Sequence, residues 1–320
     1  MRNTIRLCVC IVALAISPII DAGAQDSTPA PTGGRAPATG SSRLGAAVPY
    51  VDAEGIERGV VAVTEVIDPF DDYAEGYEPA AGAKYVVLHV TFEATGEMPY
   101  ETDPYDVLVR DDSGFLWSPA SVNRGSEPDM PEAQSQTLAT GDRISGAIGF
   151  VVPEDASLSE VYYQPESGHF ILLASFADED AEVADVGSEV TYVDAEGIEH
   201  GIVSVTEVID PFTDFPEGYE PGEGARYVVI YISFEATGDD SFDANPSNLV
   251  VRDANGFLWS PASVNRGSDP DVPDFQSQTL APGNRISGAT GFLVPEETEL
   301  AQIYYQPQSG HLILLADLEA

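Results

Sequence analysis

Cysteine is almost absent from this 320-residue chain: Cys8 and Cys10 are the only two, and both lie in the apolar segment 7–20. That segment is too short to span a bilayer comfortably. It follows a short positive stretch and precedes small residues, which is the pattern of a secretory signal peptide cleaved after Ala24. Residues 1–24 are therefore predicted to be removed. The mature chain would have no thiol, disulfide or cysteine-bound metal, and would be released outside the cell without a lipid anchor.

Positive charge is also scarce. Lys84 is the only lysine, and 54 acidic residues against 13 lysines and arginines give a formal net charge of −41. Such a chain repels phosphate backbones and anionic lipids, which excludes nucleic acid as a partner and electrostatic binding to a membrane surface. No later apolar run is long enough for membrane insertion. The acidic surface is interpreted as a solvated exterior, with a basic partner as the alternative.

Helical periodicity is missing as well. Residues 25–43 are rich in Ser, Thr, Pro and Gly and have no apolar period, so they are predicted to form a disordered linker. Residues 85–92 instead alternate with period two, which places Val86, Leu88, Val90 and Phe92 on one face of a half-buried strand. Short runs of this kind separated by Asp, Gly and Pro turn signals predict antiparallel hairpins.

The chain does contain an internal repeat. The sequence FLWSPASVNRGS at residues 115–126 recurs without change at 257–268, and the match extends outwards without a gap. Because the same module occurs twice, the sequence predicts two domains, residues 44–176 and 186–318, joined by the short acidic linker 177–185. Each is long enough to bury a core, so each is expected to fold when expressed alone. The predicted fold is all-β, with two tandem immunoglobulin-like antiparallel β-sandwiches.

The module resembles a known family in the order and spacing of several short features. They are Gly45, Glu65–Phe70, Gly82–Val87, Arg110–Gly114, Gly141, Ser145-Gly146 and Phe150–Pro153, each repeated in the second module. With these features the module is similar to an uncharacterised family of secreted bacterial domains with a telokin-like, immunoglobulin-type fold, shared with the mycobacterial immunoprotective extracellular antigen. The resemblance implies the fold and secretion, and it supplies no catalytic residues. The immunoglobulin disulfide is absent, so core packing alone must hold each sandwich.

The four histidines offer no shared catalytic pattern. His89 and His200 have no histidine at the matching place in the other module. His169 and His311 do correspond, after a Ser-Gly turn, and are interpreted as surface turn residues. The spacing brings no nucleophile, base and orienting group together, and it shows no phosphate loop and no His or Cys metal motif. The chain is therefore predicted to be no enzyme and to use no cofactor.

Two kinds of loop are candidate sites. The acidic loops 68–78 and 210–220 carry several carboxylates, as calcium prefers, but they fail the EF-hand pattern. They are interpreted as solvated loops, and no metal ligand is assigned. The repeated Trp loop combines an aromatic ring, an amide, hydroxyls and a guanidinium, which are groups enriched at binding hot spots. Its candidate binding residues are Trp117, Asn123 and Arg124 with Trp259, Asn265 and Arg266.

A structural role for the same loop is the alternative. The tryptophan would then plug the end of the sandwich, and Arg124 would pair with neighbouring carboxylates. The sequence thus predicts a secreted, non-catalytic binding or interaction protein for an unknown extracellular protein or small ligand, with two loops able to bind in a bivalent way. A calcium-binding or structural protein of the envelope exterior is the alternative function, and a secreted hydrolase is the less favoured one.

Overall fold

The computed structural model describes residues 44–125, 131–176, 184–267 and 273–318. The predicted signal peptide and first linker, residues 1–43, lie outside the described residues, and so does most of the acidic linker. The two modules are called repeat 1 and repeat 2 below. Both fall within one compact unit of the chain, residues 31–320.

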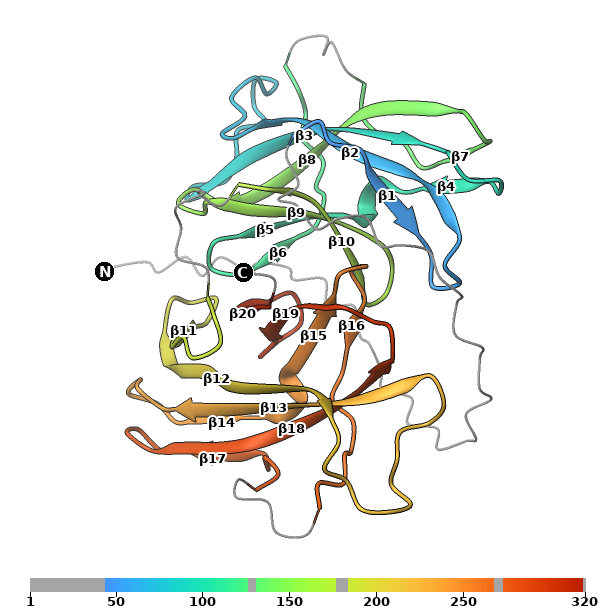
Figure 1. The fold of residues 1–320 in the computed structure, drawn as a ribbon. Helices are drawn as coiled ribbons and strands as arrows, with labels where there is room; N and C mark the ends of the chain where they lie inside the picture. The colour runs from blue at the N-terminus through green and yellow to red at the C-terminus, as the bar shows by residue number, and fades with distance from the viewer. Residues whose placement is uncertain (1–43, 126–130, 177–183, 268–272, 319–320) are drawn as a thin grey trace, which may run out of the picture. The chain divides into compact units, whose positions relative to one another are not determined.

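Repeat 1 consists of antiparallel strands in two sheets of four, with one additional strand pair (Figure 1). The first sheet has the order β1 (Val48–Val51), β2 (Glu57–Ile67), β3 (Ala83–Glu93) and β8 (Arg143–Pro153). The second has the order β10 (His169–Ser175), β9 (Leu158–Glu166), β5 (Val107–Asp111) and β6 (Leu116–Trp117). The pair is β4 (Tyr100–Thr102) with β7 (Gln136–Leu138), and a 3-10 turn, η1 (Pro104–Asp106), precedes β5.

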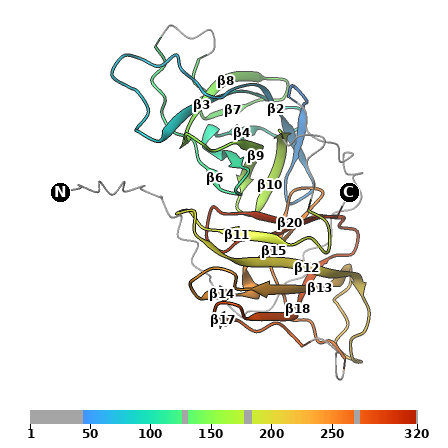
Figure 2. The same cartoon turned by 90° about the vertical axis from the view of Figure 1, so that its left-hand side faces the viewer.

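Repeat 2 has the same topology (Figure 2). Its first sheet has the order β11 (Val190–Val193), β12 (Glu199–Phe212), β13 (Ala225–Glu235) and β18 (Arg285–Pro295). Its second has the order β16 (Leu258–Trp259), β15 (Leu249–Asp253), β19 (Leu300–Tyr305) and β20 (Ile313–Asp317). The pair is β14 (Phe242–Ala244) with β17 (Gln278–Leu280), and η2 (Pro246–Asn248) matches η1. The prediction of two tandem antiparallel β-sandwiches is confirmed.

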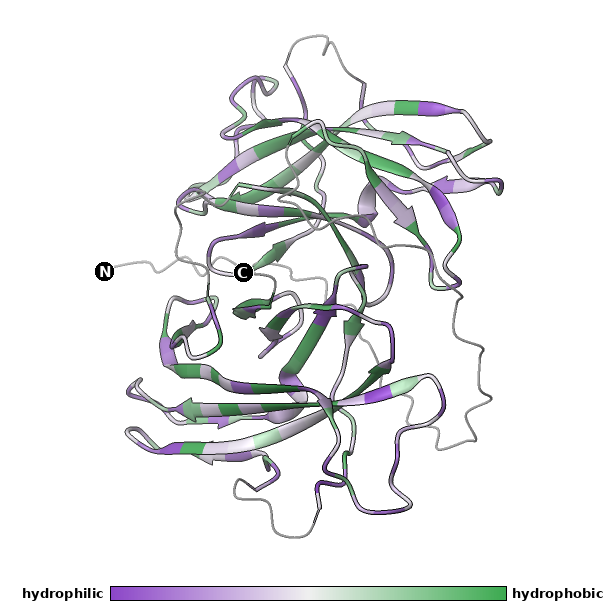
Figure 3. Cartoon of the chain, in the orientation of Figure 1, coloured by the Kyte–Doolittle hydropathy of each residue, from purple (hydrophilic) through white to green (hydrophobic). Residues whose placement is uncertain are grey.

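The core of each repeat lies between its two sheets, as the alternation in β3 predicts. Val86, Leu88, Val90 and Phe92 are at most 1% exposed, and they pack against residues of the second sheet such as Tyr163. Hydrophobic residues concentrate on the strands (Figure 3). Each fully buried aliphatic or aromatic side chain of this kind contributes about 1.5–3 kcal/mol, so these side chains provide most of the stabilisation.

The outer face of the first sheet is covered in part by the chain itself. Beyond β6, the backbone N–H of Ala120 donates to the carbonyl oxygen of Gly149 in β8 at 2.8 Å. Val122 then packs with Phe70 and Val87 in a small apolar cluster on this face. A Cβ at Gly149 would lie 2.5 Å from Val122 Cγ2, so glycine is required for the loop to cross so close to the sheet.

Neither of the described 3-10 turns, η1 and η2, approaches the length and apolar content that a membrane-crossing helix needs, and no other helix occurs in the described ranges.

We expect the substitution Gly149→Ala to destabilise repeat 1 by about 1–3 kcal/mol, because the new methyl group overpacks the contact with Val122. Gly222→Ala is the matched control, because nothing lies within 4 Å of a Cβ at that position. Thermal unfolding of both variants measures the difference. Equal melting temperatures would show that the loop is not held at this point.

Candidate binding site

The tryptophans of the repeated loop are held inside their own repeats. Trp117 is half-buried at the end of β6 and packs against the core of repeat 1. Its indole Nε1–H donates to Asp111 Oδ2 at 2.9 Å, and the backbone N–H of Phe115 donates to Asp111 Oδ1 at 2.8 Å. Trp259 repeats the bond to Asp253 Oδ2 at 2.9 Å. Burial raises the pKa of the Asp111 carboxyl, and these hydrogen bonds partly offset the effect. These contacts hold the tryptophan at the start of the loop.

The rest of the loop is joined to the acidic loop of the same repeat. The Asn123 carbonyl oxygen accepts a hydrogen bond from the Ala74 N–H at 2.8 Å, and the Gly125 N–H donates to the Asp72 carbonyl oxygen at 2.8 Å. The backbone of Arg124 forms an isolated antiparallel β-bridge with that of Tyr73. From the sequence the two loops are separate candidate sites, whereas backbone hydrogen bonds hold them side by side in the structure.

The acidic loops show no arrangement typical of a calcium site. Asp68 is paired with Lys84 at 2.8 Å, and Asp210 with Arg226 at 2.6 Å. Across the described ranges, no group of three or more His, Cys, Asp or Glu side chains is placed to hold a metal ion. The carboxylates closest to the sheet therefore act as partners for basic side chains.

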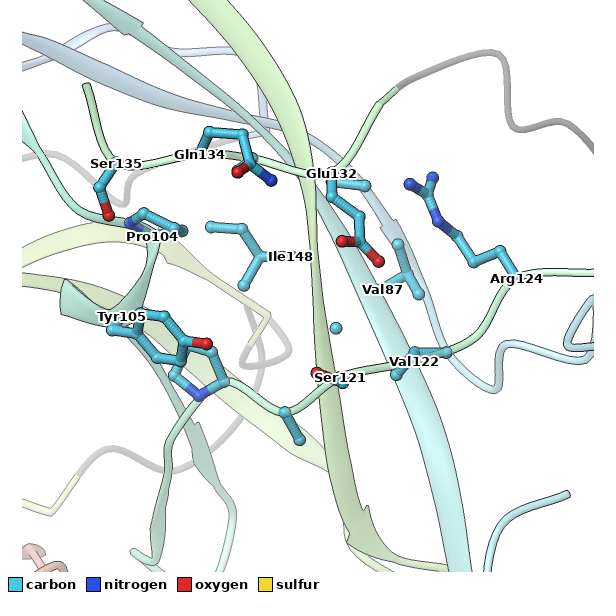
Figure 4. Close-up of a pocket in the computed structure, with 15 residues that line it drawn as sticks. Val87, Pro104, Tyr105, Ser121, Val122, Arg124, Glu132, Gln134, Ser135 and Ile148 are labelled. Atoms are coloured by element: carbon cyan, nitrogen blue, oxygen red, sulfur yellow. The ribbon is translucent and has the colours of Figure 1, made fainter. Parts of the chain in front are cut away.

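A cavity of about 180 Å³ lies over β8 of repeat 1, between the loop 119–124 and the segment 132–135 (Figure 4). Small and apolar groups form its floor: Val87, Ala147, Ile148 and Gly149. Polar groups surround it: Tyr105, Ser121, Arg124, Glu132, Gln134 and Ser135. Figure 4 shows Tyr105 at one end, with Arg124 and Glu132 at the other. The Tyr105 ring is 67% exposed although it is large and aromatic.

A second, more open hollow adjoins the first and shares Arg124, Glu132 and Gln134 with it. It also includes Asn123 and Tyr77, whose side chain is 53% exposed. The two hollows together are called the repeat 1 groove below. Asn123 and Arg124, which the sequence predicts as binding residues, lie along this groove, and Trp117 lies outside its lining.

Repeat 2 has the same loop sequence in different surroundings. Phe275 stands where repeat 1 has Ala133, and its ring is buried in the core of repeat 2, 5.0 Å from that of Phe234. Arg266 is only 7% exposed, forms an ion pair with Asp274 at 2.8 Å and lies 5.8 Å from the Tyr231 ring centre. Asn265 remains exposed. Arg266 is thus packed into its own repeat, in contrast to the half-buried Arg124.

Residues 55–169 and residues 197–311 each match the family model described as a domain of unknown function, DUF4352. The chain belongs to this family. It contains two DUF4352 domains in tandem, which confirms the resemblance to an uncharacterised domain family. No curated protein matches the chain.

Several solved structures are similar to one part of this DUF4352 chain. The yjhA protein from Bacillus subtilis is 18% identical, with a TM-score of 0.29 over 42% of this chain and 84% of that one. A putative lipoprotein, ycdA, from the same organism is 14% identical, with a TM-score of 0.32 over 42% of this chain and 39% of that one. The secreted protein MPT63 from Mycobacterium tuberculosis is 16% identical, with a TM-score of 0.31 over 43% of this chain and 99% of that one.

The two corresponding histidines of the DUF4352 pair are not on the surface, and that interpretation was wrong. His169 is 1% exposed and His311 is fully buried, because the hairpin tip of each repeat is covered by the other repeat. His169 stacks on Phe257 with ring centres 3.9 Å apart, and His311 stacks on Phe115 at the same distance. The turn signal alone could not reveal a covering element more than eighty residues away in sequence.

Each of these histidines has one ring nitrogen paired and one unpaired. His169 Nε2 lies 3.0 Å from the Asn255 carbonyl oxygen and His311 Nε2 lies 3.0 Å from that of Ser113, so Nε2 carries the proton in both. The Nδ1 atoms are buried without a hydrogen-bond partner among the described residues. Burial lowers the pKa of both imidazoles from 6.5 to about 4, with Arg252 near His169 and Arg110 near His311 acting in the same direction.

We expect His169 and His311 to contribute a loss of stability as the pH drops from about 6.5 to about 4. Both histidines have a lowered folded-state pKa, so the unfolded chain binds more protons in this window, and each contributes up to about 1.4 kcal/mol per pH unit. The double variant His169→Gln/His311→Gln keeps a donor for each carbonyl and removes the titration. Urea unfolding at a series of pH values should give a shallower dependence for this variant, and identical slopes would contradict the assignment.

Arg266→Ala should lower the melting temperature of the full chain more than Arg124→Ala. The first removes a buried guanidinium that is paired with Asp274 and packed by Tyr231, which is worth about 1–2 kcal/mol, and the second removes a half-buried one. Differential scanning calorimetry compares the two variants. A larger loss from Arg124→Ala would show that the two loops do not differ in this way.

Proposed function

We propose that this protein is a secreted, non-catalytic binding protein and that the repeat 1 groove is its ligand site. The observation that carries the proposal is the pair of exposed aromatic rings, Tyr105 and Tyr77, at a groove with an apolar floor and a polar rim. Binding sites typically combine apolar contact area with a few placed polar groups. Tyrosine supplies such area at a small cost in side-chain entropy.

The charge of the chain supports this location. With a formal net charge of −41, carboxylates are the commonest charged groups of the chain, and they are costly to desolvate at the centre of an interface. The groove lining has a single carboxylate, Glu132, beside the Gln134 amide, the Ser121 and Ser135 hydroxyls and the Arg124 guanidinium. A neutral ligand with many hydrogen-bonding groups, or an extended neutral peptide, fits this rim without requiring a large positive potential.

The geometry gives catalysis no comparable support. His169 and His311 are buried between the repeats and stacked on phenylalanine rings, so neither lies at the groove. The groove lining includes Ser121 and Ser135 but no histidine or lysine that could act as a base for them. Binding is therefore the function that the described residues favour.

We expect the double variant Tyr105→Ala/Gln134→Ala to weaken binding at least about tenfold without a change in melting temperature, because both side chains are exposed. Ser247→Ala/Gln276→Ala, at the matching places of repeat 2, is the control variant. Binding is measured on printed arrays of neutral glycans and of peptides, with the full chain as analyte. Two results would contradict the proposal: full binding by the repeat 1 variant, or an equal loss in the control.

A further inference from the structure

The repeat 1 groove has a backbone N–H donor on its floor, that of Gly149. β8 is the last strand of the first sheet, so every second residue turns its N–H and C=O groups away from β3. Ala147 is one of these residues, because its N–H donates to the Pro131 carbonyl oxygen at 2.8 Å and its own carbonyl oxygen accepts from the Ala133 N–H at 2.9 Å. Gly149 is the next, because its carbonyl oxygen accepts from the Ala120 N–H at 2.8 Å. The Gly149 N–H therefore points to the same edge, and no acceptor for it occurs among the described residues.

This donor lies between two segments that already cover the edge of β8. Glu132 is bridged to Ala147 on one side, and the loop 119–124 meets the strand at Gly149 on the other. A peptide that adds to a sheet as a new strand needs a run of free N–H and C=O groups along the edge. At the groove the edge offers a single N–H instead. A ligand that brings one carbonyl oxygen fits this position, and a peptide strand does not.

The groups around the Gly149 N–H match those of an acetamido substituent, which has a carbonyl oxygen, a small methyl group and an N–H. The carbonyl oxygen is the acceptor that the Gly149 N–H requires. The methyl group matches the apolar floor formed by Val87 and Ala147. The acetamido N–H has acceptors in the lining, namely the Gln134 amide and the Glu132 carboxylate, which Figure 4 shows close to β8.

The size of the cavity indicates that it encloses one substituent of a larger ligand. Its volume is about 180 Å³, whereas pockets that enclose a whole ligand typically measure roughly 300–1,000 Å³. The rest of the ligand would lie over the adjoining open hollow. Tyr105 and Tyr77, 67% and 53% exposed, offer rings on which the apolar face of a sugar can pack. The Ser121 and Ser135 hydroxyls can pair with sugar hydroxyls.

Charge restricts the ligand to neutral sugars. The lining of the groove contains one guanidinium, Arg124, and one carboxylate, Glu132. The chain around it has a formal net charge of −41, so glycans with carboxylate or phosphate groups are repelled. An amino sugar is neutral when its nitrogen is acetylated, and acetylation is also what supplies the carbonyl oxygen.

We propose that the repeat 1 groove binds glycans of N-acetylated amino sugars and that the Gly149 N–H donates to the acetamido carbonyl oxygen. This inference rests on the proposed function, because it assigns a ligand class to the same groove. It makes the Gly149 backbone a specificity-determining group, in addition to the side chains on the rim.

The first test is calorimetric titration of the full chain with two neutral tetrasaccharides that have the same glycosidic linkage, one of N-acetylglucosamine and one of glucose. We expect the acetylated sugar to bind at least about tenfold more tightly, because glucose leaves the Gly149 N–H without an acceptor. The variant Tyr105→Ala/Gln134→Ala should lose this binding. Equal affinities, or no binding of the acetylated sugar, would overturn the proposal.

The same titrations separate this proposal from the proposed function. If the groove binds the glucose tetramer or an arrayed peptide in its place, and Tyr105→Ala/Gln134→Ala abolishes that binding, the ligand class is wrong and the groove is still the site. If the acetylated sugar binds equally well to the double variant, the site itself is wrong.

The second test follows the Gly149 amide directly in nitrogen–proton correlation spectra of the labelled full chain. Gly291 is the internal control, because its carbonyl oxygen also accepts from a loop N–H, that of Ala262 at 2.8 Å, while Ser247 replaces Tyr105 in repeat 2. The N-acetylglucosamine tetramer should shift the Gly149 signal and leave the Gly291 signal in place. Saturation with an unmoved Gly149 signal, or equal shifts of both signals, would contradict the role of this N–H.

Discussion

Apolar packing between the two sheets of each repeat is the constraint on which the rest of the structure depends. No disulfide joins the sheets in the part of the chain that the structure describes, so the inward side chains of β3 and β13 must hold them together. Val90 and Phe92 are at most 1% exposed, and their counterparts Ile232 and Phe234 are equally buried. This packing fixes the position of β8, and the groove is built on the outer face of β8.

Duplication has given two loops of identical sequence in different settings. The loop residues up to Arg124 and Arg266 are the same, but the segment that follows has Ala133 in one repeat and Phe275 at the matching place in the other. Ala133 lines the groove of repeat 1, whereas the Phe275 ring is buried in the core of repeat 2. The proposed binding site thus lies in repeat 1, and the matching loop of repeat 2 is packed into its own repeat. The bivalent use of both loops stays a prediction.

The contacts between the two repeats bear on whether the repeats can move independently. Two domains on a short acidic linker would be expected to move independently, yet Tyr162 and Tyr304 are each 1% exposed and within hydrogen-bond distance of each other. The expectation that each repeat folds alone remains a prediction. Separation of the repeats would cost the free energy of exposing the apolar surface between them. A separated repeat 1 would expose an apolar face that carries Arg110 and the aromatic side chains of Tyr162 and Phe170.

The sequence alone determined the fold class, the duplication and the strands, because period-two alternation and turn residues are local signals. It also indicated the loop in which Asn123 and Arg124 lie. It could not place Tyr105 and Gln134 beside that loop, although the departure of Tyr105 from Ser247 between the two copies was a signal that could have been used. It placed His169 on the surface, since the covering Phe257 is not visible in a local pattern, and it could not show the hydrogen bond that Trp117 donates to Asp111. Those roles were decided by the tertiary structure, because burial and partnership depend on which distant segments the sheets bring into contact.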